Sequence, residues 1–223
     1  MKKMKLEIAC FTLESAIIAQ QYGADRVELC DNMSEGGTTP NFEIAQKVRA
    51  ELRIKMNVMI RPRGGNFVYN DIEFEQMKAD ILKFKKINVD GFVFGILNED
   101  NSFAIERNKE LVELARPIPC TFHRAFDVIY DVYESLEKVI NCGFTTILTS
   151  GQTNDVIDGI EVLKTLTEKA KGRIVIMPGG GLRSSNITVL TDKVKTSYYH
   201  SSAITDSGDI ADGDEIEKIK MQL

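Results

Sequence analysis

Charged and imidazole side chains lie at or just beyond the ends of three short apolar runs in this chain: Glu28, Arg61, His123, Arg124 and Asp127. A histidine beside a carboxylate can move a proton to or from a ligand, so His123 with Glu28 or Asp127 predicts acid and base chemistry. Arginine presents several N–H donors and a permanent charge. We therefore expect the arginines to hold an anionic ligand on which the other groups act.

Three loops combine glycine with arginine or serine: RPRGG (61–65), PGGG (178–181) and SSA (201–203). Glycine lets backbone N–H groups approach an anion closely. The predicted anion site consists of Arg61, Arg63, Arg124, Gly180, Gly181, Ser201 and Ser202. Its expected partner is a small molecule that carries a phosphate or a carboxylate. The simpler alternative is that these segments are only tight turns.

Several other chemistries lack the residues that they need. Lys5 and Lys55 lie at the beginnings of their apolar runs, opposite the polar groups, so a Schiff-base enzyme has no nucleophile. The chain has 2 His, too few for a three-histidine zinc site, and no HExxH. It also has neither GxxxxGKS nor GxxxxGKT nor GxGxxG, the usual nucleotide signatures.

Positioning the polar groups requires the apolar runs to be strands of one sheet. Eight such runs occur: 6–10, 26–30, 56–61, 91–96, 120–126, 145–150, 173–178 and 196–203. Stretches with apolar spacing near that of a helix alternate with them: 13–21, 42–51, 72–87, 105–115, 132–141, 156–171, 186–191 and 210–223. Regular alternation of this kind favours a (β/α)8 TIM-type barrel, short and with few insertions, over a doubly wound sheet. Because no linker divides the chain, we expect a single domain over 1–223.

Residues with a capping preference mark several helix ends in this pattern. Asp71, Asp131 and either Ser184 or Ser185 are predicted N-caps. Gly143 and Gly172 are predicted C-terminal stops.

Alternation along each strand determines which side chains face the barrel interior, because successive side chains point to opposite faces. With the apolar face toward the helices, the interior gathers Glu7, Glu28, Cys30, Asn57, Arg61 and His123. Buried charges need partners or a function. One explanation is a structural network in which Arg61 bridges the two glutamates. We favour a site, because barrel enzymes place their working residues at the carboxyl ends of strands.

Composition narrows the class of protein. The formal net charge is −5, from 28 Lys plus Arg against 33 Asp plus Glu, which argues against nucleic-acid binding. No apolar stretch approaches the ~20 residues that cross a bilayer, so we expect no membrane association. The 4 Cys form no CxxC and lie in apolar segments, which is typical of a reduced cytoplasmic protein.

Six blocks of the sequence, in order, resemble the CutC copper homeostasis family: GADRVELC (23–30), SEGGTTP (34–40), NVMIRPRGGNFVY (57–69), TFHRAFD (121–127), ILTSGQ (147–152) and IMPGGG (176–181). The resemblance covers nearly the whole chain, from Leu6 to about Ala203. It implies a TIM-type barrel, a cytoplasmic location, a homodimer and a role in copper tolerance through Cu(I) binding.

The resemblance also implies two cysteine ligands for copper, one on each of the first two strands. Cys30 matches the second position, but Ala9 stands at the first. The neighbouring Cys10 is predicted to point toward the helices. Because Cu(I) prefers sulfur ligands, Cys30 with Met59 or His123 is the remaining candidate for a copper site. Without a second thiolate, such a site is predicted to bind copper more weakly and less specifically.

Overall fold

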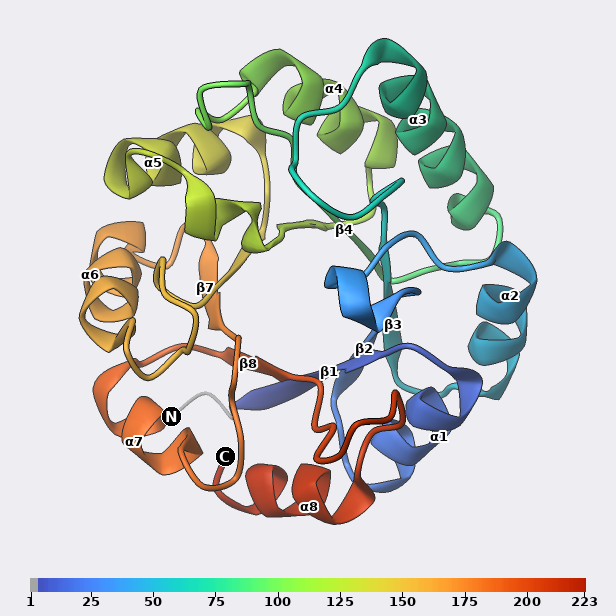
Figure 1. The fold of residues 1–223 in the computed structure, drawn as a ribbon, viewed down its shortest axis with the longest axis vertical. Helices are drawn as coiled ribbons and strands as arrows, with labels where there is room; N and C mark the ends of the chain where they lie inside the picture. Colours follow the sequence, from blue (N-terminus) through green and yellow to red (C-terminus); the bar gives the residue numbers. More distant parts are fainter. Residues whose placement is uncertain (1–3) are drawn as a thin grey trace.

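Strands and helices alternate along the chain in the computed structural model, which describes residues 4–223 (Figure 1). The strands are β1 (Lys5–Cys10), β2 (Arg26–Leu29), β3 (Lys55–Met59), β4 (Gly91–Phe94), β5 (Cys120–Phe122), β6 (Thr146–Thr149), β7 (Val175–Pro178) and β8 (Tyr198–Ser201). The helices are α1 (Leu13–Gln21), α2 (Phe42–Glu51), α3 (Asp71–Lys85), α4 (Ile105–Ala115), α5 (Val132–Cys142), α6 (Ile160–Ala170), α7 (Ile187–Lys193) and α8 (Gly213–Met221). Two short 3-10 helices, η1 (Met33–Glu35) and η2 (Arg124–Val128), follow β2 and β5.

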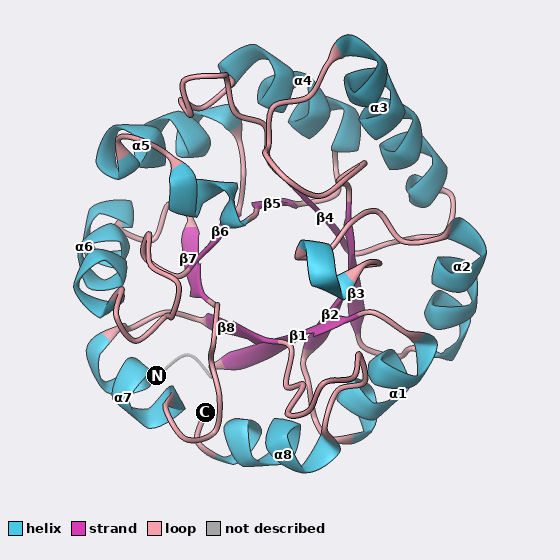
Figure 2. Ribbon diagram, in the orientation of Figure 1, coloured by secondary structure: helices cyan, strands magenta, loops and turns pink. Residues whose placement is uncertain are grey.

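The strands form one parallel sheet that curls into a ring, with the helices around its outside (Figure 2). The hydrogen-bonded order is β7-β6-β5-β4-β3-β2-β1-β8. Between the two ends of this order, the Thr196 side chain before β8 donates to the Ile176 carbonyl oxygen of β7 at 2.5 Å. This arrangement confirms the predicted (β/α)8 TIM-type fold. Among residues 4–223, no helix combines the length and the apolar character that a bilayer crossing requires.

Side chains alternate between the two faces of the ring as predicted. In β3, Met56 and Val58 are fully buried in the apolar layer beneath the helices. Asn57 faces the interior, where its side-chain amide donates to Glu7 Oε2 at 3.1 Å. The apolar layer therefore holds the helices on the ring, and the interior is left for polar groups.

Glu7 obtains its charge partner from the neighbouring strand. The guanidinium of Arg26, in register with Glu7 on the β1–β2 ladder, pairs with the Glu7 carboxylate. Arg61 makes no ion pair with either glutamate, and its terminal nitrogens donate to backbone carbonyls instead. The interpretation of Arg61 as a bridge between Glu7 and Glu28 was therefore wrong.

The N-cap of α3 is one residue earlier than predicted. The side chain of Asn70, not that of Asp71, accepts from the Glu73 backbone N–H at 3.0 Å. In return, the Glu73 carboxylate accepts from the Asn70 backbone N–H at 2.9 Å. Asp71 lies in the first turn of the helix. At α5 the predictions are confirmed, since Asp131 caps its first turn and Gly143 ends it in the left-handed conformation.

The last three helices, in contrast, begin later than the sequence pattern predicts. Segment 150–159 forms a loop before α6, and α7 follows Asn186. Ser184 does not cap α7, because its N–H and hydroxyl donate to the Glu215 carboxylate of α8. Helix α8 begins after Asp212, which caps it by accepting from the Glu215 N–H.

Candidate functional site

A cavity of about 540 Å³ opens among the loops that follow the strands. Most of the predicted site residues line it: Glu28, Cys30, Arg61, His123, Arg124, Asp127, Gly180, Gly181, Ser201 and Ser202. They come from loops or strand ends after β2, β3, β5, β7 and β8. Side chains that are distant in the sequence therefore share one space at the carboxyl ends of the strands, where barrel enzymes carry their sites.

Arg63 is not among the lining residues. Its guanidinium pairs with Glu73 at 2.5 Å and donates to the Val68 carbonyl oxygen at 2.7 Å. It fastens the loop after β3 to the first turn of α3. The structure therefore does not place Arg63 with the other predicted anion-binding residues.

A chain of buried charged groups runs beneath the cavity. His200 Nδ1 lies 2.9 Å from Glu7 Oε1, and its Nε2 lies 3.8 Å from Glu28 Oε2. Burial alone would raise the pKa of Glu7, but the Arg26 and His200 charges outweigh it and lower that pKa. Burial likewise opposes the charged form of His200, yet its bond to Glu7 and the charge of Glu28 raise its pKa. Glu7 is therefore held as a carboxylate, and His200 is held toward its protonated form.

Glu28 differs from Glu7 because it lacks a full set of partners. Burial, with the nearby Glu7 charge, raises the pKa of Glu28 to about 7, although His200 acts in the opposite direction. Its Oε1 is buried without a hydrogen-bond partner among residues 4–223. A carboxyl group of this kind can release or accept a proton near neutral pH.

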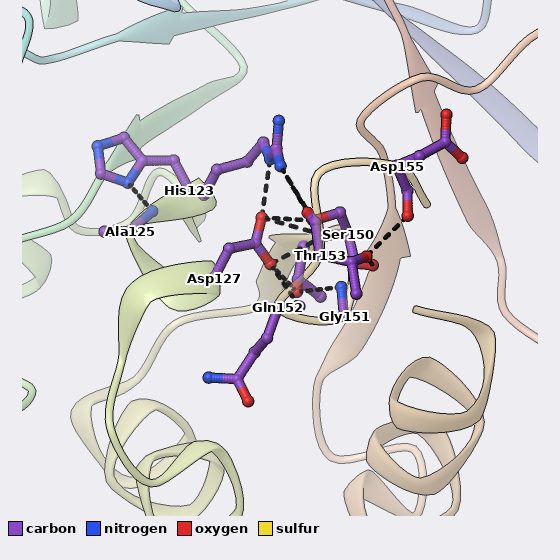
Figure 3. Close-up of polar contacts among 10 residues, drawn as sticks. His123, Ala125, Asp127, Ser150, Gly151, Gln152, Thr153 and Asp155 are labelled. Carbon is purple, nitrogen blue, oxygen red and sulfur yellow. Dashed lines mark hydrogen bonds and ion pairs between the residues drawn. The ribbon is translucent and has the colours of Figure 1, made fainter. Parts of the chain in front are cut away.

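His123 lines the same cavity and has one ring nitrogen without a partner among residues 4–223. Its Nδ1 accepts from the Ala125 N–H at 3.3 Å, so the neutral ring carries its proton on Nε2 (Figure 3). That Nε2 is buried and has no partner within the described chain. Burial and the charge of Arg61 lower the pKa of His123 to about 3. At neutral pH the ring is therefore an uncharged hydrogen-bond donor.

Arg61 is a buried guanidinium, 4% exposed, that forms no ion pair within residues 4–223. Its terminal nitrogens donate to three carbonyl oxygens, of Glu35, Gly37 and Gly65, at 2.7 to 3.0 Å. These bonds hold the loop that contains η1 against the loop after β3. Its Nε is buried and unpaired among residues 4–223. The site thus contains a positive charge without a negative partner.

Asp127 has both carboxylate oxygens engaged (Figure 3). It accepts from the Thr149 hydroxyl, the Ser150 N–H and hydroxyl, and the Gln152 N–H. It also pairs with Arg124 Nε at 2.7 Å. This carboxylate orders the loop after β6 and orients Arg124, and it has no oxygen left free for proton transfer.

His200 and Arg183 line the cavity but were not among the predicted site residues. His200 follows the fully buried Tyr199, so alternation along β8 was the signal that could have placed it inside the ring. Arg183 lies two residues beyond the glycine loop after β7. It donates to the Leu182 and Ile204 carbonyl oxygens and to the Ser201 hydroxyl, and so joins the loops after β7 and β8.

The donors around Cys30 fit copper poorly. Its thiol is buried 3.6 Å from Glu28 Oε2, and burial, followed by that negative charge, raises the pKa of Cys30 well above its usual value. Met59 packs beside it, but Ala9 adds no donor. Among residues 4–223, no three His, Cys, Asp or Glu side chains are arranged to hold a metal ion. The residues present do not form the thiolate site that Cu(I) favours.

Fold and cavity together define a class of protein, the TIM-type barrel with a polar site at the carboxyl ends of its strands. The CutC family model matches residues 4–205, and the chain belongs to the CutC family. It is 45% identical over 198 residues to the copper homeostasis protein cutC homolog of Homo sapiens, spanning 89% of this chain and 72% of the relative. It is 42% identical over 198 residues to a family protein CutC of Chromobacterium violaceum, and the match spans 89% of this chain and 80% of that relative.

A solved structure of a CutC protein from Streptococcus agalactiae has the same fold. It superimposes with a TM-score of 0.85 at 36% sequence identity, over 89% of this chain and 98% of the other. The family that the sequence blocks indicated is thereby confirmed, as is the barrel.

Proposed function

We propose that this protein takes part in copper homeostasis, as the names of its relatives state for them, and that its barrel cavity is a binding site for a small anionic molecule. Arg61 carries the second part of the proposal. A buried charge without a partner costs several kcal/mol, so such a group is retained where a ligand supplies the missing charge. Beside it, the unpaired His123 Nε2–H offers a second donor. Phe67 contacts both groups, with its ring 4.9 Å from each.

A titration with gluconate, a carboxylate probe, tests the anion site. NMR should detect gluconate binding to the unaltered protein. The gluconate affinity should be at least tenfold lower in Arg61→Gln and partly restored in Arg61→Lys. The matched control is Arg173→Met, because Arg173 pairs with Glu137 on the surface, outside the cavity. Thermal melting of each variant shows whether it is folded. Equal gluconate affinity in Arg61→Gln and the unaltered protein would refute the anion site.

Copper itself is expected to bind weakly at Cys30. In a competition titration with a chromophoric Cu(I) chelator, Cys30→Ser should change the Cu(I) affinity by less than about twofold, since Ala9 supplies no second thiolate. Tight stoichiometric Cu(I) binding that is lost in Cys30→Ser would instead make the cavity a copper site.

An enzymatic role is the second candidate function, favoured by the unpaired Glu28 Oε1 and His123 Nε2 in one cavity. Glu28 would take a proton from carbon beside a carbonyl group, and the His123 N–H would stabilise the negative oxygen that results. Solvent deuterium should then enter at least one member of a panel of phosphorylated ketoses in the presence of the protein, and Glu28→Gln should abolish the exchange. Exchange that persists in Glu28→Gln, or none across the panel, excludes this role.

A cytoplasmic location and a homodimeric state belong to the same proposal. Four free cysteines, at positions 10, 30, 120 and 142, are buried in the described chain, which suits a reducing compartment. Sedimentation of the purified protein tests the dimer.

A further inference from the structure

The cavity has a second group of anion-binding donors, across the ring from Arg61. In the closed order of eight strands, β3 and β7 are four positions apart in either direction, so their loops lie on opposite sides. The loop after β7 contains Gly180 and Gly181, with φ of 106° and 78°. Neither amide N–H donates a hydrogen bond to any residue in 4–223. Two donors that line a cavity are thereby left to a ligand.

Arg124 completes this second group. Its Nε binds Asp127 and its NH2 binds Ser150, which leaves NH1 without a partner in the described structure. The guanidinium lies directly against Gly180, because a Cβ built there would be 3.2 Å from Arg124 NH1. A side chain at this position would crowd the guanidinium, and the φ of 106° also favours glycine. Asp155, the carboxylate nearest Gly181, accepts from the Ile157 N–H and does not line the cavity.

The two groups of donors differ in the ligand chemistry that they suit. Arg61 Nε and His123 Nε2 offer two N–H groups, which match the two oxygens of a carboxylate. Gly180, Gly181 and Arg124 NH1 offer three N–H donors, which match the three free oxygens of a phosphate monoester. Arg183 fixes the loops after β7 and β8 to each other, so this second group is held in place.

We infer that the ligand has two anionic ends, a phosphate at Gly180, Gly181 and Arg124 and a carboxylate at Arg61 and His123. This inference rests on the proposed anion site and adds the substrate class, a small phosphorylated carboxylic acid. A cavity of about 540 Å³ accommodates a molecule of that size. Glu28 and His200 line the cavity as well, so the middle of such a ligand lies within their reach.

Three probes separate the two ends: inorganic phosphate, gluconate and 6-phosphogluconate, which carries both groups. Because linked groups bind with a high effective concentration, 6-phosphogluconate should bind at least about tenfold more tightly than either single-ended probe. Arg124→Gln should weaken phosphate and 6-phosphogluconate at least fivefold and leave gluconate unchanged. Arg61→Gln should weaken gluconate and 6-phosphogluconate and leave phosphate unchanged. Arg173→Met should alter none of the three.

The outcomes distinguish the two proposals. If Arg124→Gln leaves phosphate affinity unchanged while Arg61→Gln still weakens gluconate, the second group of donors is overturned and the anion site stands. If phosphate depends on Arg124 but gluconate does not depend on Arg61, the proposed anion site fails at Arg61. If 6-phosphogluconate binds no better than phosphate alone, the two-ended ligand is overturned. Ser202, a member of the predicted anion site, lines the cavity in the loop after β8, which Arg183 joins to the loop after β7. We expect its hydroxyl to contact the same phosphate, so Ser202→Ala tests this site if Arg124→Gln does not fold. A lowered phosphate affinity supports the phosphate site, and an unchanged one counts against it.

Discussion

Single residues in the cavity owe their properties to burial and to the charge beside them. His123 and His200 are both buried histidines, yet their pKa values move in opposite directions. Burial and the Arg61 charge lower the first, whereas two carboxylates raise the second against burial. The same side chain is thus a neutral donor directly after β5, whereas on β8 its pKa is shifted toward the protonated form, and the neighbouring charges decide the direction.

The lowered pKa of His123 predicts a pH dependence of stability. The unfolded chain binds a proton at His123 near pH 6.5, whereas the folded chain binds it only near pH 3. The free energy of unfolding is therefore unaffected by His123 above pH 6.5 and decreases as the pH falls from 6.5 toward 3. His123→Asn removes this loss. Between pH 7 and pH 4, the free energy of unfolding, measured with urea, should fall by roughly 2–3 kcal/mol less in this variant than in the unaltered protein. Parallel pH profiles would show that the ring titrates normally.

Arg26 supplies the counter-charge of a fully buried carboxylate. We expect Arg26→Met to destabilise the fold by about 3–5 kcal/mol, because Glu7 would keep a buried charge without its main partner. Adding Glu7→Gln to this variant should recover part of the loss. Arg173→Met, which breaks an exposed pair, should leave urea unfolding nearly unchanged. Equal effects of the two single changes would contradict a special role for the buried pair.

At the scale of elements, alternation in the sequence predicted the strands because each has one apolar face. It placed Glu28 and His123 in the interior for the same reason. Alternation did not predict which charged side chains on neighbouring strands pair with each other. Glu7 and Arg26 meet only because β1 and β2 pair in one particular register, which one sequence does not specify. The roles of Asp127 and Arg63 were missed likewise, since each depends on a loop whose path the sequence pattern leaves open.

Helix α3 gives a test of an element boundary. Asn70 forms a capping box with Glu73, whereas Asp71, the predicted cap, is exposed and pairs with Arg107. Asn70→Ala should therefore lower the free energy of unfolding by about 1 kcal/mol. Asp71→Ala serves as the matched control and should have a smaller effect in the same thermal or urea melts. The reverse order would restore Asp71 as the cap.

For the whole molecule, the closed ring and its covering helices bury all four cysteines at positions 10, 30, 120 and 142. Burial also raises the pKa of each thiol, which lowers its reactivity. A thiol reagent such as DTNB should label no cysteine rapidly in native buffer and all four in guanidinium chloride. Rapid labelling of one thiol in the native protein would reveal local opening, and single serine variants would identify it.

Arg61 both holds two loops together and carries a donor without a partner among residues 4–223. Its terminal nitrogens hold the η1 loop against the loop after β3, and its Nε is buried without a hydrogen-bond partner among residues 4–223. In the proposed anion site, a replacement of Arg61 therefore alters the contact between these two loops together with the binding of the carboxylate. A change of ligand specificity that keeps these loops in place would therefore have to come from residues across the ring, such as Arg124.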